Sequence, residues 1–77
     1  MNLKSLSDKW PSSIVSRDEI GTFTGGVILP KSLANLDSLG KGPEGAFRIG
    51  RKIAYSVENV VSWLEGRASL RKDVDHV

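Results

Sequence analysis

The sequence predicts a small α+β domain, and three segments support that prediction. Residues 30–43, PKSLANLDSLGKGP, begin with proline, space leucines by three and end in glycines, as a short helix and its exit do. Residues 47–55, FRIGRKIAY, alternate apolar with mostly basic side chains around Gly50-Arg51, which predicts a β-hairpin. Residues 57–64 place apolar side chains at i, i+3, i+4 and i+7, which predicts a closing helix. Together these segments predict a small winged helix-turn-helix, with three short helices and a two-stranded β-hairpin wing.

The length of 77 residues allows one domain. We expect a flexible N-terminal arm over 1–13, the winged helix-turn-helix domain over 14–67 and a flexible C-terminal tail over 68–77. The chain has no cysteine, which excludes disulfides and thiolate zinc sites. It has neither an apolar run long enough to span a membrane nor an apolar signal core. These features predict a cytoplasmic protein without membrane contact.

The first helix is expected over 17–23. Ser16 is a suitable N-cap, and Glu19 has the spacing of a capping box. The helix would bury Ile20 and Phe23, and two glycines after Thr24 would end it.

The second helix is expected to begin at Pro30 and to bury a leucine face. The apolar linker 27–29 should lie beneath this helix. The buried side chains of the helix should be Leu33, Leu36 and Leu39. In the hairpin, Gly50 at the first central position favours a two-residue type II′ turn. Four aromatic residues are expected to pack in or against the core: Trp10, Phe47, Tyr55 and Trp63.

The positive charge is concentrated in the middle of the chain. Residues 29–55 contain five basic and two acidic side chains, a net charge of +3, whereas the remaining fifty residues have a net charge of −1. A solvated surface with chance clustering is the alternative interpretation. The concentration predicts an anionic partner at the second helix and hairpin.

The residues needed for catalysis are missing. The single histidine, His76, lies in the expected tail, and no carboxylates cluster at ligand spacing. Gly40-Lys41-Gly42 lacks the preceding strand and following helix of a phosphate-binding loop. We therefore expect no enzyme activity, no cofactor and no metal.

Duplex DNA is the anionic partner that the arrangement favours. Lys31, Ser32 and Asn35 fall on the exposed face of the second helix, where a recognition helix contacts base edges. The alternative for Ser32 and Asn35 is simple solvation or capping. Arg48, Arg51 and Lys52 surround the hairpin tip and suit phosphates or a minor groove. Asp37 argues against DNA, because it adds a negative charge to the second helix.

The chain resembles the excisionase-like DNA-binding proteins of phages and mobile elements, which include AlpA-type regulators and belong with the MerR-like winged-helix domains. The resemblance covers residues 14–66 and is strongest over 48–55, RIGRKIAY, followed by Trp63-Leu64. It implies a protein that binds specific double-stranded DNA sites, often as several copies side by side. Such a protein acts with an integrase as an excisionase (recombination directionality factor) or regulates transcription. Asp37 and the long apolar turn before Pro30 depart from the family pattern.

A different class of function also fits the sequence. The low net charge and Asp37 also suit a winged-helix protein-interaction module that does not bind DNA. A phage packaging or replication accessory protein is a further possibility on the DNA-binding side.

Overall fold

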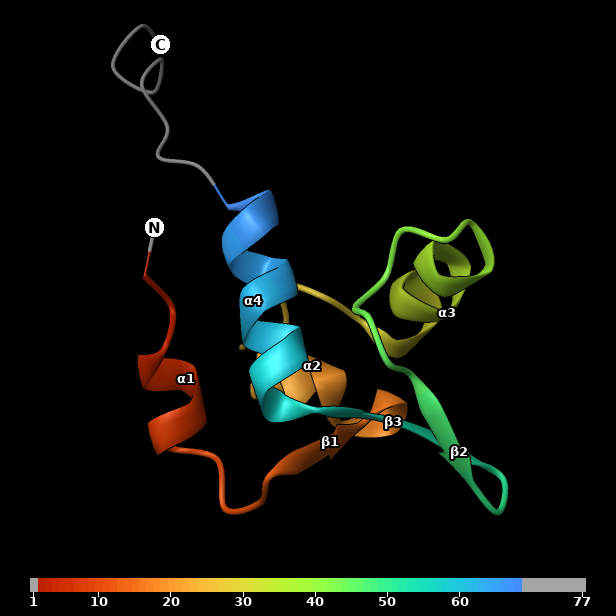
Figure 1. Ribbon diagram of the computed structural model, residues 1–77, viewed down its shortest axis with the longest axis horizontal. Helices are drawn as coiled ribbons and strands as arrows, with labels where there is room; N and C mark the ends of the chain where they lie inside the picture. The colour runs from red at the N-terminus through yellow and green to blue at the C-terminus, as the bar shows by residue number, and fades with distance from the viewer. Residues whose placement is uncertain (1, 69–77) are drawn as a thin grey trace, which may run out of the picture.

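The computed structural model describes residues 2–68 (Figure 1). Its helices and strands form a small α+β domain, with a three-stranded antiparallel sheet of order β1-β3-β2. In chain order the elements are α1 (Ser5–Asp8), β1 (Ile14–Ser16), the 3₁₀ helix η1 (Arg17–Glu19), α2 (Ile20–Phe23), α3 (Pro30–Ser38), β2 (Phe47–Ile49), β3 (Lys52–Ser56) and α4 (Val57–Arg67). Residues 2–68 contain no helix that combines the length and the apolarity needed to cross a bilayer.

The hairpin of β2 and β3 is the one that the sequence predicts. Ile49 pairs with Lys52, so the loop consists of Gly50 and Arg51 alone. Gly50 has a φ of 61°, and Arg51 does not adopt a positive φ. A positive φ at the first central residue only is the signature of a type II′ turn, so the predicted turn is confirmed.

The expected two-stranded wing is incomplete, because β3 also pairs with β1. Ile14 lies opposite Ser56 and Ser16 opposite Ala54, so β3 is the central strand. Val15 is fully buried at the middle of β1. A strand of three residues is too short to show the alternation that identifies longer strands, so the sequence indicated only a short extended segment at Ile14-Val15 and not its pairing with β3.

The segment expected to be a flexible arm is instead packed on the domain. It contains α1, a fourth α-helix where three were predicted, and Leu3, Leu6 and Trp10 pack against the core. The indole N–H of Trp10 donates to the carbonyl of Ile14 at 2.9 Å. The ring of Trp10 meets that of Phe23 edge to face, with centroids 5.1 Å apart. The expected packing of Trp10 is therefore confirmed. The predicted C-terminal tail lies outside the described residues except for Ala68.

The helix expected over 17–23 begins at its predicted cap, Ser16, as η1 followed by α2, and α4 begins after the cap Ser56. At η1, the Glu19 carboxylate accepts hydrogen bonds from the backbone N–H and the hydroxyl of Ser16, at 3.1 and 3.0 Å. At α4, the Ser56 hydroxyl accepts from the backbone N–H of Asn59 at 3.0 Å. These bonds satisfy polar groups that a helix N-terminus otherwise leaves unpaired.

The core lies between the sheet and α2, α3 and α4. The buried apolar residues are Val15, Ile20, Phe23, Leu33, Ala54, Tyr55, Val57, Val60, Val61 and Leu64. The predicted faces of the first and last helices are thus confirmed, and Tyr55 is in the core as expected. Removing these side chains from water is the main force that holds the helices against the sheet.

Several apolar residues are more exposed than predicted. Val27 is 77% exposed and Leu29 53% exposed, so only Ile28 of the apolar linker packs against the core. Leu39, expected on the buried face of the second helix, is 59% exposed because α3 ends at Ser38 and the chain turns away. Phe47 is 36% exposed on the edge strand β2 and is not a core residue.

Candidate nucleic-acid interface

Helix α3 presents the three polar residues that the sequence assigned to base contacts. Pro30 occupies the first turn, and the N–H of Leu33 donates to the carbonyl of Leu29 at 2.9 Å, which starts the helix. Leu33 is fully buried and fixes which face of α3 points inward. The exposed residues of the helix are Lys31, Ser32, Asn35 and Ser38, and the first three are those assigned to base contacts.

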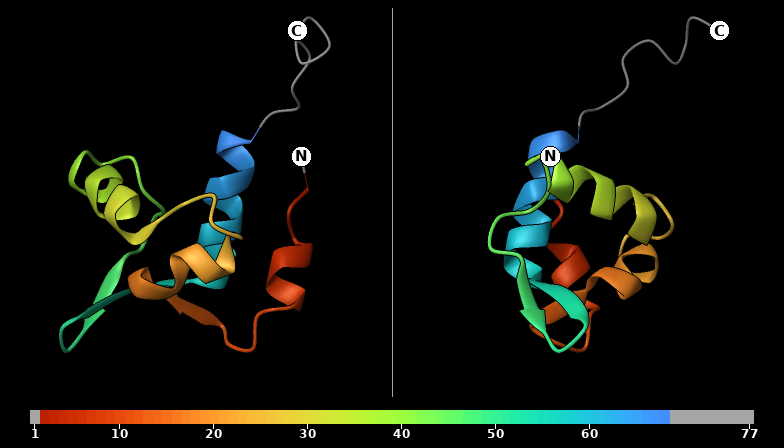
Figure 2. Two further views of the ribbon diagram at one scale, coloured as in Figure 1. Left: turned by 180° about the vertical axis from the view of Figure 1, so that it is seen from behind. Right: turned by 90° about the vertical axis from the view of Figure 1, so that its right-hand side faces the viewer.

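The hairpin projects from the same side of the molecule as α3. Both elements lie on the right in Figure 1 and face the viewer in the right panel of Figure 2. Arg48, Arg51 and Lys52 are all exposed, with Arg51 at the turn itself. The structure therefore places α3 and the hairpin, the two elements that contain the predicted residues, on one side of the protein.

Lys52 differs from the two arginines because its ammonium group has an intramolecular partner. It forms an exposed ion pair with the carboxylate of Asp18 on η1. The hydrogen bond that Lys52 donates to Asp18, together with the negative charge of Asp18, raises the pKa of Lys52 above the ordinary lysine value. Asp18 therefore offsets one of the positive charges next to the hairpin turn.

Asp37 does not face solvent as an isolated charge. Its Oδ2 atom accepts hydrogen bonds from Nη2 of Arg17 at 2.6 Å and from the hydroxyl of Tyr55 at 2.5 Å. The same hydroxyl accepts from Nε of Arg17 at 3.1 Å. The three side chains come from α3, η1 and β3, so this network attaches α3 to the sheet. The negative charge that argued against DNA is paired with Arg17.

The network changes the acid–base properties of its members. Burial is the main reason that the pKa of Tyr55 rises to about 12, and the hydrogen bond to Asp37 adds to it. The hydrogen bond to Tyr55, followed by that to Asp37, raises the pKa of Arg17 despite its partial burial. Arg17 thus stays charged and Tyr55 stays neutral at physiological pH.

A groove of about 440 Å³ runs between the loop after α3 and the hairpin. Arg17, Asp37, Phe47, Arg48 and Ile53 contribute to its walls. Arg48 lies opposite Ile53 in the β2–β3 register. The groove extends from the hairpin to α3, so Arg48 is part of a surface that is continuous between the two elements.

Sequence reasoning missed three residues of this region. Arg17, Asp18 and Tyr55 determine how α3 and the hairpin are held and how much charge they present. Arg17 is 20 positions from Asp37 and 38 from Tyr55, so no local spacing relates them. The signal available in the sequence was Asp37, an acidic residue within a basic segment. Such a placement suggests that the carboxylate pairs with a cation of the same protein, which here is Arg17.

Among residues 2–68, no group of three or more histidine, cysteine, aspartate or glutamate side chains is placed to hold a metal ion. Comparison of the chain with protein-family models, with curated proteins and with solved structures finds no match.

Proposed function

We propose that this protein binds double-stranded DNA in a sequence-specific manner, with a winged helix-turn-helix arrangement. In this proposal α2 and α3 form the helix-turn-helix, and the β2–β3 hairpin is the wing. The resemblance stated above favours a phage or mobile-element excisionase, acting with an integrase, or an AlpA-type transcription regulator.

One observation supports the proposal most directly. Helix α3, on which Lys31 and Asn35 are exposed one turn apart, lies on the same side of the molecule as the hairpin, which carries exposed Arg51 at its turn. An asparagine on a recognition helix can hydrogen-bond both the N6 and N7 positions of adenine, and lysine can donate to guanine or phosphate. Arg51 would contact the phosphate backbone or the minor groove beside that site.

The electrostatics of the surface are compatible with this docking. Asp37 is neutralised by Arg17, which removes the main objection raised by the sequence. Arg48 and Arg51 are exposed on the hairpin, and Lys31 adds a third exposed charge from α3. The ion pair between Lys52 and Asp18 reduces the contribution of Lys52.

A second candidate function is a protein-interaction module of the same shape that does not bind DNA. The exposure of Phe47 and Ile49 on the edge strand β2 favours it, because apolar side chains on a hairpin suit a protein surface. Ile49 is 60% exposed.

Fluorescence anisotropy of a labelled duplex library, measured over a salt series, distinguishes the two functions. Sequence-specific binding predicts tight association with a subset of duplexes and a logarithmic salt slope of about 0.9 per phosphate contacted. Equally weak association with every duplex at physiological salt would contradict DNA binding and favour the interaction module.

A further inference from the structure

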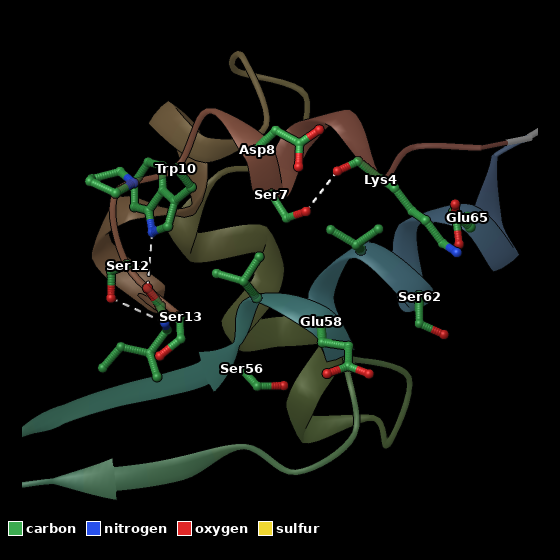
Figure 3. A pocket seen from close by; sticks show the side chains of 14 residues that line it. Lys4, Ser7, Asp8, Trp10, Ser12, Ser13, Ser56, Glu58, Ser62 and Glu65 are labelled. Carbon is green, nitrogen blue, oxygen red and sulfur yellow. Dashed lines mark hydrogen bonds between the residues drawn. The ribbon is translucent and has the colours of Figure 1, made fainter.

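A second surface lies on the side of α4 that is turned away from α3 and the hairpin (Figures 1 and 3). It is a cleft of about 990 Å³ between α1, the segment that joins α1 to β1, and one side of α4 from Val57 to Glu65. The proposed DNA-binding function uses none of the residues that form it.

The walls of the cleft combine apolar area with negative charge. Trp10, Pro11, Ile14 and Val61 contribute apolar surface, and Ile14 is 40% exposed. The charged residues of the lining are Asp8, Glu58 and Glu65 against Lys4, a net charge of −2. Asp8 and Glu58 are exposed, whereas Glu65 is half-buried and accepts a 2.7 Å hydrogen bond from the N–H of Leu3.

The backbone of β1 cannot form hydrogen bonds with a strand added at this cleft. Strand β1 is an edge strand, but the backbone groups of Ile14 already have partners. The carbonyl of Ile14 accepts a 2.9 Å hydrogen bond from the indole N–H of Trp10, and the N–H of Ile14 donates a 3.1 Å hydrogen bond to the hydroxyl of Ser12. Local side chains thus occupy the edge, which prevents an added strand from pairing there. Recognition must come from the side chains of the cleft.

We propose that this cleft binds a short basic peptide segment of a partner protein. An apolar side chain of the peptide would rest on Trp10 and Ile14, and flanking lysine or arginine groups would pair with Asp8 and Glu58. Charge complementarity identifies this occupant, because the acidic cleft repels a phosphate backbone and attracts cations. The peptide and a duplex would occupy opposite sides of α4, so this proposal does not depend on DNA binding.

Selection of a random heptapeptide phage library on the immobilised full chain tests the proposal. We expect enrichment of peptides that combine lysine or arginine with an apolar residue. No enrichment, or enrichment of acidic or uncharged peptides, would overturn it. Fluorescence anisotropy of the most enriched peptide then gives its affinity for each variant.

Two charge reversals locate the bound peptide. Glu58→Lys should lower the affinity for the most enriched peptide by at least about fivefold. Glu44→Lys makes the same charge change on an exposed residue outside the cleft and should leave the affinity unchanged. Equal affinities for the two variants would place the peptide elsewhere and overturn the proposal. Glu58→Gln, which removes the charge without reversing it, should give an intermediate loss, and thermal unfolding checks that each variant is folded.

Discussion

Asp37 on α3 and Arg17 on η1 form a partly buried ion pair, with 2.6 Å between Oδ2 and Nη2. The exposed fractions of the two side chains are 17% and 26% respectively. Tyr55 of the central strand bonds to both partners, so one network joins a helix, a 3₁₀ turn and the sheet. The orientation of α3, and with it the proposed recognition face, depends on this network.

Replacing Asp37 by asparagine should destabilise the protein. The change leaves the Arg17 guanidinium without a countercharge in a partly buried position, and we expect the free energy of unfolding to fall by about 1–3 kcal/mol. Urea denaturation measures the change. Asp8→Asn removes an exposed carboxylate of the same type and should alter the free energy by no more than about 0.5 kcal/mol. Similar losses in the two variants would contradict a stabilising role for the network.

The network also predicts how stability depends on alkaline pH. The pKa of Tyr55 is about 12 in the folded protein, against about 10 in an unfolded chain. A raised folded-state pKa means that the stabilisation is complete below about pH 10 and is lost as the pH rises through about 12. Between about pH 10 and about pH 12, the free energy of unfolding of the wild type should therefore fall more than that of the Tyr55→Phe variant.

The titration itself can be followed directly. Tyr55 is the only tyrosine in the chain, so the ultraviolet absorbance of tyrosinate reports this residue alone. The midpoint in the folded protein should lie about two pH units above that in denaturant. A folded-state midpoint near 10 would show that the hydroxyl is neither buried nor bonded to Asp37.

Helix α3 could be predicted from the sequence, whereas the network of Arg17, Asp37 and Tyr55 could not. The first turn at Pro30, the buried Leu33 and the turn at Gly50-Arg51 follow from local spacing, and the structure confirms them. The exposure of Lys31 and Asn35 follows from the burial of Leu33 on the opposite face. Local patterns of this kind report on residues within one or two turns of each other.

The remaining features depend on contacts between residues far apart in the chain. The pairing of β1 with β3 brings Val15 beside Tyr55, and neither segment contains a signal for the other. The ion pair of Lys52 with Asp18 joins residues 34 positions apart. Helix α1 is a single turn without an apolar repeat, so its position is decided by packing against the core.

Gly42 should be intolerant of a side chain, because the chain passes close to Asp37 there. A Cβ atom at this position would overlap Oδ1 of Asp37 and lie 2.9 Å from its Cγ. Gly42→Ala should displace the carboxylate, lower the free energy of unfolding and move the midpoint of the Tyr55 titration towards 10. Gly66→Ala is the control: a Cβ there meets nothing within 4 Å, and alanine should stabilise α4 by about 0.5–1 kcal/mol. An unchanged Tyr55 titration in Gly42→Ala would contradict the close approach.

Two substitutions at the proposed interface should have different effects on DNA binding. Arg51→Ala should weaken binding to all duplexes and reduce the salt slope by about 0.9, because a phosphate contact is lost. Asn35→Ala should mainly reduce the preference for the best duplex, by about 1–3 kcal/mol, because a base contact is lost. Anisotropy over a salt series measures both effects. Lys9→Ala removes an exposed charge next to α1, away from α3 and the hairpin, and should leave both quantities unchanged. Docking through α3 and the hairpin would be ruled out if Arg51→Ala and Asn35→Ala both behaved like Lys9→Ala.

The ion pair between Lys52 and Asp18 predicts a substitution that strengthens DNA binding. Asp18→Asn removes a negative charge from the proposed interface and releases the Lys52 ammonium group, which can then reach a phosphate. We expect a higher affinity for all duplexes at low salt and a salt slope steeper by about 0.9. Both side chains are more than half exposed, so stability should change by less than about 0.5 kcal/mol. In a Lys52→Ala background the same substitution should leave the slope unchanged, because no lysine is released. A slope that steepened equally in both backgrounds would mean that Asp18 acts only by long-range repulsion and that Lys52 does not contact DNA.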